Sequence, residues 1–367
     1  MIRPREAIEG LEASYHGGIQ VHDLEGVRRE ELIDFSVSAN PYPPPDSVVA
    51  AARRVPIERY PDSRARRLQG ALARLNGLEE EQIAVVNGTS QALWLIALAY
   101  LSPGDTVLTF PPTYSDYRMV SRMMGAKTVE LPTRREDAFK PDITAAAKLI
   151  TSDRIRVAWL CNPNNPTSSC LSEEELEPLL VACSAAGTLL VLDEAYANFA
   201  PRRPESEKLV DRYPLLLMRS MTKDFNLNAL RLGYIAAHPE IARVIDRVQP
   251  PWSVNTPAEE AGLAALEELD YYRDSWRKTG ELTEELGAGM EEIGFTRYPA
   301  GCNFQLFQGP ENLQLASRLW ERGMKIRDCT SFGLPGFFRI GTASREANLR
   351  LLKAVTEIYS TGTGSPR

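Results

Sequence analysis

A lysine in a hydroxyl-rich turn is the residue of this sequence with the clearest chemical use. Lys223 follows an apolar stretch, residues 215–218, lies beside Ser220 and Thr222, and precedes Arg231 by eight residues. Burial disfavours the charged form of lysine, and a neutral amine can form a Schiff base with a carbonyl compound. Hydroxyl groups and an arginine suit a phosphate. A lone lysine after a strand is more often a solvated surface residue, so the interpretation depends on the rest of the chain.

Polar residues also follow other apolar stretches, at the points where the strands of a parallel sheet would end. Ligands of open α/β sheets bind at the carboxyl ends of the strands. The turn at Gly88 opens a helix, and the first N–H groups of a helix bind anions. The candidate binding residues at these points are Gly88, Thr89, Ser90, Tyr114, Asn165, Asp193, Tyr196, Ser220, Thr222, Lys223 and Arg231.

This set suits pyridoxal 5'-phosphate, a flat phosphorylated pyridine aldehyde. Asp193 would keep the ring nitrogen protonated, which makes the ring an electron sink. Tyr114 would stack on the ring, and Asn165 and Tyr196 would hydrogen-bond its oxygen. Lys223 would attach the cofactor and then act as the general base. Each residue alone has a structural explanation, but their joint occurrence predicts Lys223, Asp193 and Tyr196 as catalytic residues.

Composition restricts the class of protein. The chain has 367 residues, enough for two domains, and its formal net charge of -7 argues against a nucleic-acid or membrane-surface partner. No apolar run reaches transmembrane length, and the first residues lack the apolar segment of a signal peptide. Five scattered cysteines form no CxxC pair. We therefore expect no metal site and a cytoplasmic location.

Apolar strands alternate with helices through the first two thirds of the chain. Continuous apolar strands separated by helices predict a mostly parallel sheet covered on both faces. After residue 255 the pattern changes to one long charged helical stretch, residues 257–293, followed by short strands and helices. The predicted organisation is an N-terminal arm at 1–45, a large cofactor-binding domain at 46–255, a small C-terminal α+β domain at 256–360 and a tail at 361–367.

Three motifs, residues 162–167, 193–196 and 220–234, resemble the fold-type I, pyridoxal-phosphate-dependent class I/II aminotransferase superfamily. The resemblance covers nearly the whole chain. It implies the aspartate aminotransferase fold and a homodimer whose active site is shared between subunits. By this resemblance, Tyr60 would reach the cofactor phosphate of the neighbouring subunit. Arg339 would bind the α-carboxylate of the substrate, and Arg327 its distal, anionic end.

Two families within the superfamily are similar to different segments. Residues 16–18, 251–255 and 327–329 resemble threonine-phosphate decarboxylases, in which the histidine corresponding to His16 lies near the substrate phosphate. Residues 333–335 and 341–348 resemble histidinol-phosphate aminotransferases. The leading hypothesis is an aminotransferase for an amino acid or amino-phosphate substrate. The alternative is a threonine-phosphate decarboxylase-like enzyme of the cobalamin side-chain pathway.

Two other classes are less well supported. A non-catalytic, cofactor-binding regulator of this fold normally carries an added DNA-binding domain, for which no N-terminal extension exists here, and the acidic charge opposes it. A nicotinamide-dependent enzyme would need the motif G-x-G-x-x-G after a strand, and this motif follows none of the predicted strands. The chain also departs from both families, with Ser168 in place of a usual glycine and Asp224 in place of an apolar residue after Lys223. We expect Asp224 to face solvent; an inward carboxylate would stabilise the protonated amine.

Overall fold

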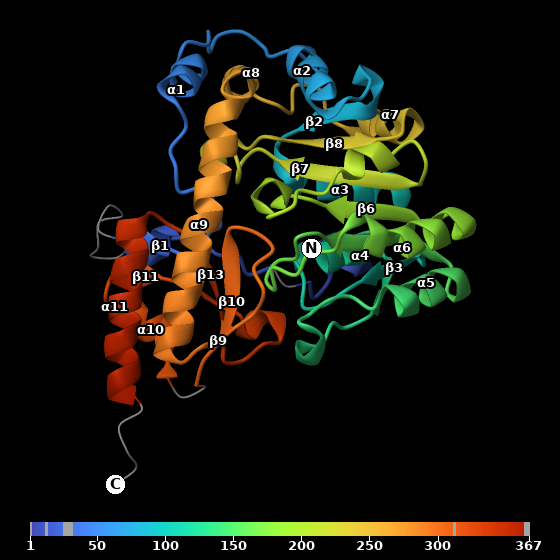
Figure 1. Ribbon diagram of the computed structural model, residues 1–367. Helices are drawn as coiled ribbons and strands as arrows, with labels where there is room; N and C mark the ends of the chain where they lie inside the picture. Colours follow the sequence, from blue (N-terminus) through green and yellow to red (C-terminus); the bar gives the residue numbers. More distant parts are fainter. Residues whose placement is uncertain (1, 12–13, 25–31, 311–312, 363–367) are drawn as a thin grey trace.

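The computed structural model describes residues 2–11, 14–24, 32–310 and 313–362. A seven-stranded sheet with the order β2-β8-β7-β6-β5-β3-β4 forms the centre of its larger part (Figure 1). β8 is antiparallel to both of its neighbours, and the other adjacent pairs are parallel, so the predicted mostly parallel α/β sheet is confirmed. The strands are β2 (Ile83–Val86), β3 (Thr106–Thr109), β4 (Lys127–Glu130), β5 (Ile155–Cys161), β6 (Leu189–Asp193), β7 (Leu215–Ser220) and β8 (Gly233–Ala237).

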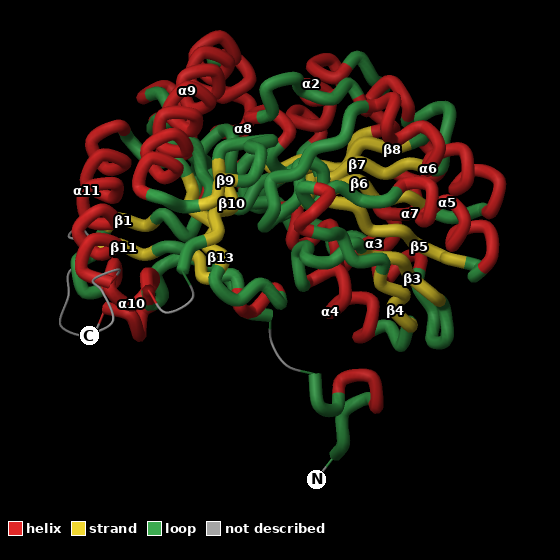
Figure 2. Tube along the Cα trace, turned by 60° about the horizontal axis from the view of Figure 1, so that its bottom comes forward, coloured by secondary structure: helices red, strands yellow, loops and turns green. Residues whose placement is uncertain are grey.

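Helices cover both faces of this sheet, which explains why its central strands are apolar over most of their length. Successive side chains of a strand point to opposite faces, so in β6 Leu192 packs into one core and Val191 into the other. Each such burial contributes roughly 1.5–3 kcal/mol relative to exposure. Figure 2 shows α5 and α6 on one side of the strands and α3 and α4 on the other. The covering helices are α2 (Arg66–Asn76), α5 (Ile143–Ser152) and α6 (Glu173–Ala186) on one face, and α3 (Gly88–Tyr100), α4 (Asp116–Met123) and α7 (Pro239–Val248) on the other.

A smaller antiparallel sheet lies beside the large one, with the order β12-β13-β10-β9. Helices of the last hundred residues pack on it around buried phenylalanines such as Phe307 and Phe338. A two-stranded parallel sheet joins residues of the N-terminal segment to this part through β1 and β11. The elements are β1 (Ile33–Asp34), α9 (Leu269–Ile293), β9 (Thr296–Arg297), β10 (Phe304–Gln308), α10 (Leu315–Trp320), β11 (Met324–Lys325), β12 (Arg327–Asp328), β13 (Phe337–Gly341) and α11 (Arg345–Gly362).

The helical stretch expected as one element, residues 257–293, is two helices. α8 (Thr256–Glu267) ends at Glu268, whose backbone leaves the helical region, and α9 starts at the next residue. α8 packs against α1 (Asp46–Arg53) and α2. The predicted boundaries at 45/46 and 255/256 stay predictions. The expected tail at 361–367 starts inside α11, and residues 363–367 lie outside the described part of the chain.

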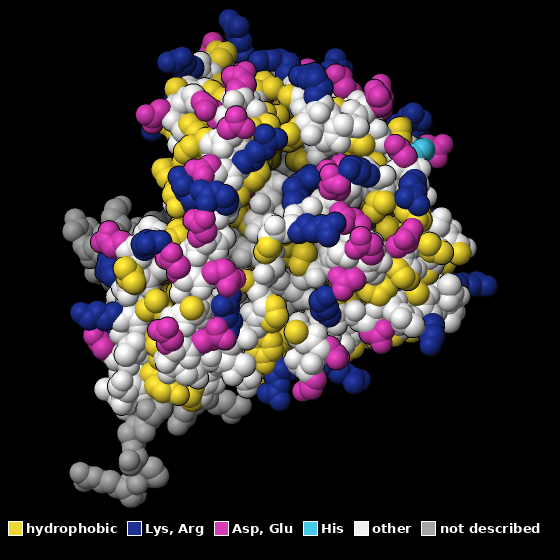
Figure 3. All heavy atoms as spheres, viewed as in Figure 1, with side chains coloured by type: hydrophobic (Ala, Val, Ile, Leu, Met, Phe, Trp, Pro, Cys, Tyr) yellow, Lys and Arg dark blue, Asp and Glu magenta, His cyan; other side chains and the backbone are white. Residues whose placement is uncertain are grey.

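Short 3-10 helices occupy several connections: η1 (Glu6–Ile8), η2 (Val21–Leu24), η4 (Glu80–Gln82), η5 (Arg135–Asp137), η6 (Ala197–Phe199), η7 (Ser206–Leu209), η8 (Asn228–Leu230) and η10 (Thr330–Phe332). On the face drawn in Figure 3, basic and acidic side chains are interspersed. On α9, for example, Asp274 pairs with both Arg277 and Lys278. Within the described ranges, no helix has both the length and the apolar character needed to cross a membrane.

Candidate active site

A cavity of about 450 Å³ opens where β5, β6 and β7 end. Most of the predicted site residues line it, although they come from distant parts of the sequence. The strand order explains this, because parallel neighbours place their carboxyl ends at one edge of the sheet. The predicted residues in its wall are His16, Thr89, Ser90, Tyr114, Asn165, Asp193, Tyr196, Thr222, Lys223, Arg231 and Arg339.

Lys223 follows the fully buried strand β7 and is itself half-buried. Its carbonyl oxygen accepts a hydrogen bond of 2.8 Å from the backbone N–H of Asn40. Burial, and then the positive charges of Arg339 and Arg231, lower the pKa of the Lys223 amine to about 8. The amine can therefore be neutral, and nucleophilic or basic, close to neutral pH.

Asp193 is the last residue of β6 and is buried. Burial raises the pKa of its carboxyl group to about 6, against the effect of hydrogen bonds from the Tyr117 hydroxyl, at 2.7 Å, and the Ala195 N–H, at 3.1 Å. Tyr117 is held by parallel stacking on Trp159, with 5.5 Å between ring centroids. A carboxylate fixed in this way can hold the proton of a nitrogen base placed against it.

Tyr117 was not among the predicted residues, although it lines the cavity. A signal for it existed in the sequence. Tyr117 stands three residues after Tyr114, at the start of the helix that follows the loop of Tyr114, so the two aromatic side chains had to lie close to each other. The two rings contact each other edge to face, with centroids 5.5 Å apart.

Two further phenols face the same space and are kept protonated by their surroundings. Burial raises the pKa of both Tyr114 and Tyr196. The ring of Tyr196 packs edge to face on Phe304, with 4.9 Å between centroids. Each hydroxyl is therefore available as a hydrogen-bond donor at neutral pH.

The start of α3 forms a tight cup for an anion. Gly88, the first residue of α3, has φ of +71°, and a Cβ atom there would lie 3.1 Å from an Nη atom of Arg231. A Cβ atom on Gly233 would lie 3.1 Å from the backbone nitrogen of Thr89. The absence of these two side chains lets Arg231 approach the N-terminus of α3, where Thr89 and Ser90 line the cavity. A helix N-terminus with an adjacent arginine suits a phosphate.

Ser220 contributes from behind this cup. Its Oγ lies 2.6 Å from Oγ1 of Thr222 and also accepts a 3.2 Å hydrogen bond from the Thr222 N–H. Thr222 lines the main cavity, whereas Ser220 lines a second cavity behind it. Of these two predicted phosphate ligands, Thr222 therefore lies in the wall of the main cavity, and Ser220 lies behind it and holds Thr222 in place.

Arg339, from the central part of β13, brings a buried positive charge to the opposite wall. Its Nη1 donates to Oδ1 of Asn165 at 2.5 Å, and its Nη2 donates to the carbonyl oxygen of Ser36. Both acceptors are neutral, and Nε has no partner among the described residues. A buried guanidinium with a donor to spare suits a carboxylate ligand.

Arg327 does not line this cavity. It is buried beside it, donating to the carbonyl oxygen of Tyr15 at 3.1 Å and to Oγ of Ser331 at 2.7 Å. It lines a neighbouring cavity of about 460 Å³, together with Arg118 and Arg122 of α4. The three arginines make that space attractive for an anion.

His16 and Tyr60 have different positions. His16 lines the main cavity, with Nε2 3.6 Å from Oδ1 of Asp116 and its ring 5.8 Å from that of Tyr114. Tyr60 is 83 % exposed and contacts the ring of Trp252, away from the cavity wall. Within one chain, Tyr60 is therefore not brought to the site.

The expectation that Asp224 faces solvent is wrong. The residue is buried, and its Oδ2 accepts a hydrogen bond of 2.5 Å from Nδ2 of Asn198. Its carboxylate does not line the cavity of Lys223 but the second cavity behind it. Burial raises the pKa of Asp224 to about 7.

Comparisons with known proteins identify the family. The model of the family "Aminotransferase class I and II" matches residues 30–355. The chain belongs to this family. It is 33 % identical over 347 residues to histidinol-phosphate aminotransferase from Symbiobacterium thermophilum, covering 92 % of this chain and 95 % of that protein.

Solved structures share the fold. The histidinol-phosphate aminotransferase from Sinorhizobium meliloti in complex with pyridoxal-5'-phosphate has a TM-score of 0.86 at 24 % identity, covering 98 % of each chain. The aspartate aminotransferase from Thermus thermophilus with maleate has 0.84 at 25 % identity, covering 98 % of this chain and 100 % of that one. L-threonine-O-3-phosphate decarboxylase from Porphyromonas gingivalis has 0.79 at 25 % identity, covering 90 % and 100 %.

This class I/II aminotransferase is thus a pyridoxal-phosphate-dependent enzyme of the aspartate aminotransferase fold, acting on a small amino-acid-type substrate. The residues in its cavity fit that cofactor chemically. An anion cup formed by α3 and Arg231 suits the phosphate, and the buried carboxylate of Asp193 suits a protonated ring nitrogen. An amine of lowered pKa, Lys223, opens into the same space.

Proposed function

We propose that this enzyme transaminates an amino substrate with an anionic distal group, and that histidinol phosphate is the first candidate. One observation carries the proposal: Lys223 opens into a single cavity with Asp193, Arg231 and Arg339. The relative from Symbiobacterium thermophilum, similar over 92 % of this chain, is a histidinol-phosphate aminotransferase, which supports this choice of substrate.

The roles on the cofactor side follow from the contacts. When bound, pyridoxal phosphate supplies an electron sink for the charge that develops at the substrate Cα. Asp193, oriented by Tyr117, would hold the proton of the ring nitrogen. Tyr114 would offer a ring face, and Asn165 and Tyr196 would donate hydrogen bonds to the ring oxygen. The phosphate ligands would be the start of α3 with Gly88, Thr89 and Ser90, together with Thr222 and Arg231, and Ser220 would hold Thr222 in place.

Lys223 would hold the cofactor and then move the proton of the reaction. Transamination needs a base that takes a proton from Cα and returns it to a neighbouring carbon, so the base must lose its own proton readily. The positive charges of Arg339 and Arg231 and the half-buried position favour the neutral amine. Where the substrate carries an α-carboxylate, that group would meet the guanidinium of Arg339, which lines the cavity. Histidinol phosphate has no carboxylate, so its phosphate is its only anionic group.

The distal end of the substrate would extend toward the arginine-lined cavity. Arg327, with Arg118 and Arg122, lines that space, and His16 lies in the wall of the main cavity. A phosphate at the distal end would gain charge-assisted hydrogen bonds there. We assign Arg327 and His16 to this end of the substrate.

The proposal includes a homodimer, active in the cytoplasm, whose two subunits share each active site. Tyr60 supports it, because an 83 % exposed tyrosine packed on Trp252 is placed to reach outward from its own chain. All five cysteines are free thiols, which agrees with a reducing compartment. Tyr60 would then contact the cofactor phosphate of the partner subunit.

A single-turnover absorbance experiment tests the function. Purified enzyme with bound cofactor is mixed with histidinol phosphate, and separately with O-phosphothreonine, without any keto acid. We expect histidinol phosphate to convert the bound aldehyde to the amino form of the cofactor, with loss of its visible absorbance. Release of carbon dioxide from O-phosphothreonine, with the original absorbance restored, would instead establish a decarboxylase and reject the proposal.

A further inference from the structure

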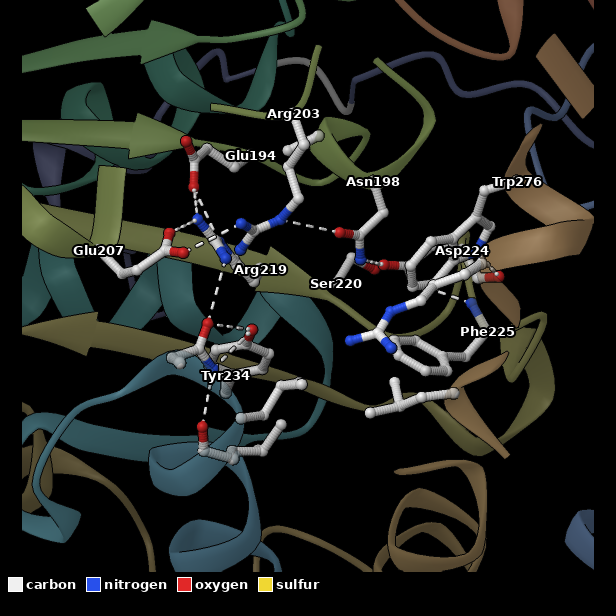
Figure 4. A pocket seen from close by; sticks show the side chains of 16 residues that line it. Glu194, Asn198, Arg203, Glu207, Arg219, Ser220, Asp224, Phe225, Tyr234 and Trp276 are labelled. Carbon is white, nitrogen blue, oxygen red and sulfur yellow. Dashed lines mark hydrogen bonds and ion pairs between the residues drawn. The ribbon is translucent and has the colours of Figure 1, made fainter. Parts of the chain in front are cut away.

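A second cavity, of about 160 Å³, lies behind the cofactor site (Figure 4). Its walls are partly apolar and partly polar, and the charged side chains that line it include Glu194, Glu207, Arg219 and Asp224. Two of these are chain neighbours of proposed catalytic residues, since Glu194 follows Asp193 and Asp224 follows Lys223. Each pair thus divides its two side chains between the two cavities.

Hydrogen bonds connect the two turns through this second cavity. Oδ2 of Asp224 accepts from Nδ2 of Asn198 at 2.5 Å, and Oδ1 of Asn198 accepts from Nε of Arg203 at 3.1 Å. Asn198 lies two residues after Tyr196. The Asp224–Asn198 link, visible as a dashed line in Figure 4, therefore joins the turn of Lys223 to the turn of Tyr196.

The far side of the link leads through a half-buried ion pair of Arg203 to buried ion pairs of Arg219. Nη1 of Arg203 lies 2.9 Å from Oε1 of Glu207, whose other oxygen lies 2.7 Å from Nη2 of Arg219. The same Nη2 lies 2.6 Å from Oε2 of Glu194. Because Arg219 and Glu194 are at most 6 % exposed, these charges are held in place with little competition from water. Asn198 is therefore attached to a rigid support.

The backbone of the lysine turn is held as well. The carbonyl oxygen of Asp224 accepts 2.9 Å hydrogen bonds from Nδ2 of Asn40 and from Nε1 of Trp276. Oδ1 of Asp224 accepts from the N–H of Phe225 at 2.9 Å. These bonds fix where the Lys223 amine can reach.

We propose that Asp224, through its hydrogen bond with Asn198, is a positioning residue for Lys223 and sets the place of its amine relative to Arg231 and Arg339. The inference rests on the proposed role of Lys223 as the cofactor lysine. Misplacing a reacting group by about 1 Å can cost on the order of 100-fold in rate, so a link of this kind has kinetic consequences.

The direction of the link permits a sharp test. Asn198 presents its amide nitrogen to Asp224 and its oxygen to Arg203. Asp224→Asn leaves a single acceptor atom for two donors: while that oxygen accepts from the Phe225 N–H, the new amide nitrogen meets that of Asn198. Asn198→Asp places two carboxylates together. The double variant Asp224→Asn/Asn198→Asp restores a donor facing an acceptor, with the new carboxylate still able to accept from Arg203.

Three measurements are made on wild type, both single variants and the double variant. The first is the separation of kcat and KM, and the second is the pH midpoint of the bound cofactor's absorbance without substrate. The charges that act on the amine of Lys223 are those of Arg339 and Arg231, and the charge that acts on Asp224 is that of Arg219. These three arginines are kept in every variant. The third is the unfolding of the cofactor-free proteins by urea, which reports the coupling between the two positions.

We expect each single variant to lower kcat about 10-fold with little change in KM, and to move the pH midpoint of the absorbance. The double variant should recover to within about 3-fold of wild type, with the wild-type midpoint and a favourable coupling in unfolding. A double variant no better than the worse single variant, or single variants equal to wild type, would overturn the proposal.

Leu72→Ala is the matched control, because Leu72 is buried and lines the same cavity, and its aliphatic side chain can form no hydrogen bond with the link. We expect Leu72→Ala to be less stable than wild type, with the wild-type pH midpoint. If Leu72→Ala shifts the midpoint as much as the single variants at 224 and 198 do, the effect is one of general packing and the proposal is overturned. A further variant, Lys223→Ala, distinguishes a failure of the positioning role of Asp224 from a failure of the proposed function. Retention of the cofactor's attached absorbance in Lys223→Ala would reject the lysine assignment itself.

Discussion

The hydroxyl oxygen of Tyr117 lies 2.7 Å from Oδ2 of Asp193, and both residues are buried at the end of the central strands. Tyr117 cannot easily move, since its ring stacks on Trp159. Oγ of Ser121 donates to the Tyr117 carbonyl oxygen at 2.7 Å and accepts from Nε1 of Trp159 at 3.1 Å. Burial raises the pKa of Asp193 to about 6, and the bond from Tyr117 opposes that rise.

Tyr117→Phe should therefore raise the pKa of Asp193 by about one unit. A neutral Asp193 cannot hold the proton of the cofactor's ring nitrogen as an ion pair. As the pH is lowered, we expect the affinity of the cofactor-free variant for pyridoxal phosphate to begin falling near pH 7. In wild type the affinity should begin falling near pH 6. Absorbance titrations between pH 5.5 and 8 measure this. Trp159→Phe retains the hydroxyl and serves as control; identical pH dependences for wild type and Tyr117→Phe would contradict the role.

Lys223 makes a second prediction, about stability. Its pKa of about 8 lies below the ordinary 10.5, so the unfolded state binds more protons between these values and stability rises with pH there. Below pH 8 the amine of Lys223 is charged in the folded state as well, and it then lowers the free energy of unfolding by its full amount. Cofactor-free Lys223→Met should be more stable than wild type by about 2–3 kcal/mol at pH 7, and by much less at pH 10. Urea unfolding at both pH values checks this.

The exposed Lys148 of α5 provides the control for that comparison. Lys148→Met should change stability little and equally at both pH values. A Lys223→Met effect of the same size at pH 7 and pH 10 would show that the amine is not destabilised by its surroundings.

Arg327 tests the assignment of the substrate's distal end. Arg327→Ala should raise KM for a phosphorylated amino substrate about 10- to 100-fold, the usual range for one lost charge-assisted hydrogen bond. KM for a neutral substrate of similar length should change less than about 3-fold. Steady-state kinetics with both substrates measure the difference. Arg322→Ala, at an exposed position nearby, is the control; equal effects of Arg327→Ala on both substrates would reject the role.

Tyr60 tests whether two subunits share a site. Tyr60→Ala and Lys223→Ala proteins should each show little activity at limiting cofactor concentration. After the subunits are mixed and exchanged, each mixed dimer would hold one site with both native residues, giving about a quarter of wild-type activity. Activity equal to the average of the two separate variants would show that Tyr60 does not act across subunits.

The fold was predictable where the sequence pattern is local. β6 and β7 are apolar at nearly every position because both faces of the sheet are covered, and this run of apolar residues is visible in the sequence. Polar residues directly after such strands, including Asp193, had to meet at one edge of the sheet. Lys223 and Asn165 also follow apolar strands and were expected at the same edge of the sheet, and both line the cavity together with Asp193.

Other features needed tertiary contacts that no local pattern contains. Asp224 was expected in solvent because an aspartate is rarely buried, yet its partner Asn198, 26 residues away in the sequence, offsets part of the cost of burial. Arg327 was expected at the far end of the substrate, and short strands such as β12 give no local indication of which cavity a side chain enters. The break at Glu268 within the long helical stretch also has no glycine or proline to announce it.

The backbone of the lysine turn depends on two residues from distant parts of the chain, Asn40 and Trp276. Chains are synthesised from the N-terminus, and domains fold largely in that order. Asn40 is therefore present long before the turn of Lys223 has been made, whereas Trp276 is added only after the whole central sheet. The support of the cofactor's attachment point is therefore completed late in synthesis. A nascent chain that already contains every strand of the central sheet still lacks one of the two residues that hold the turn.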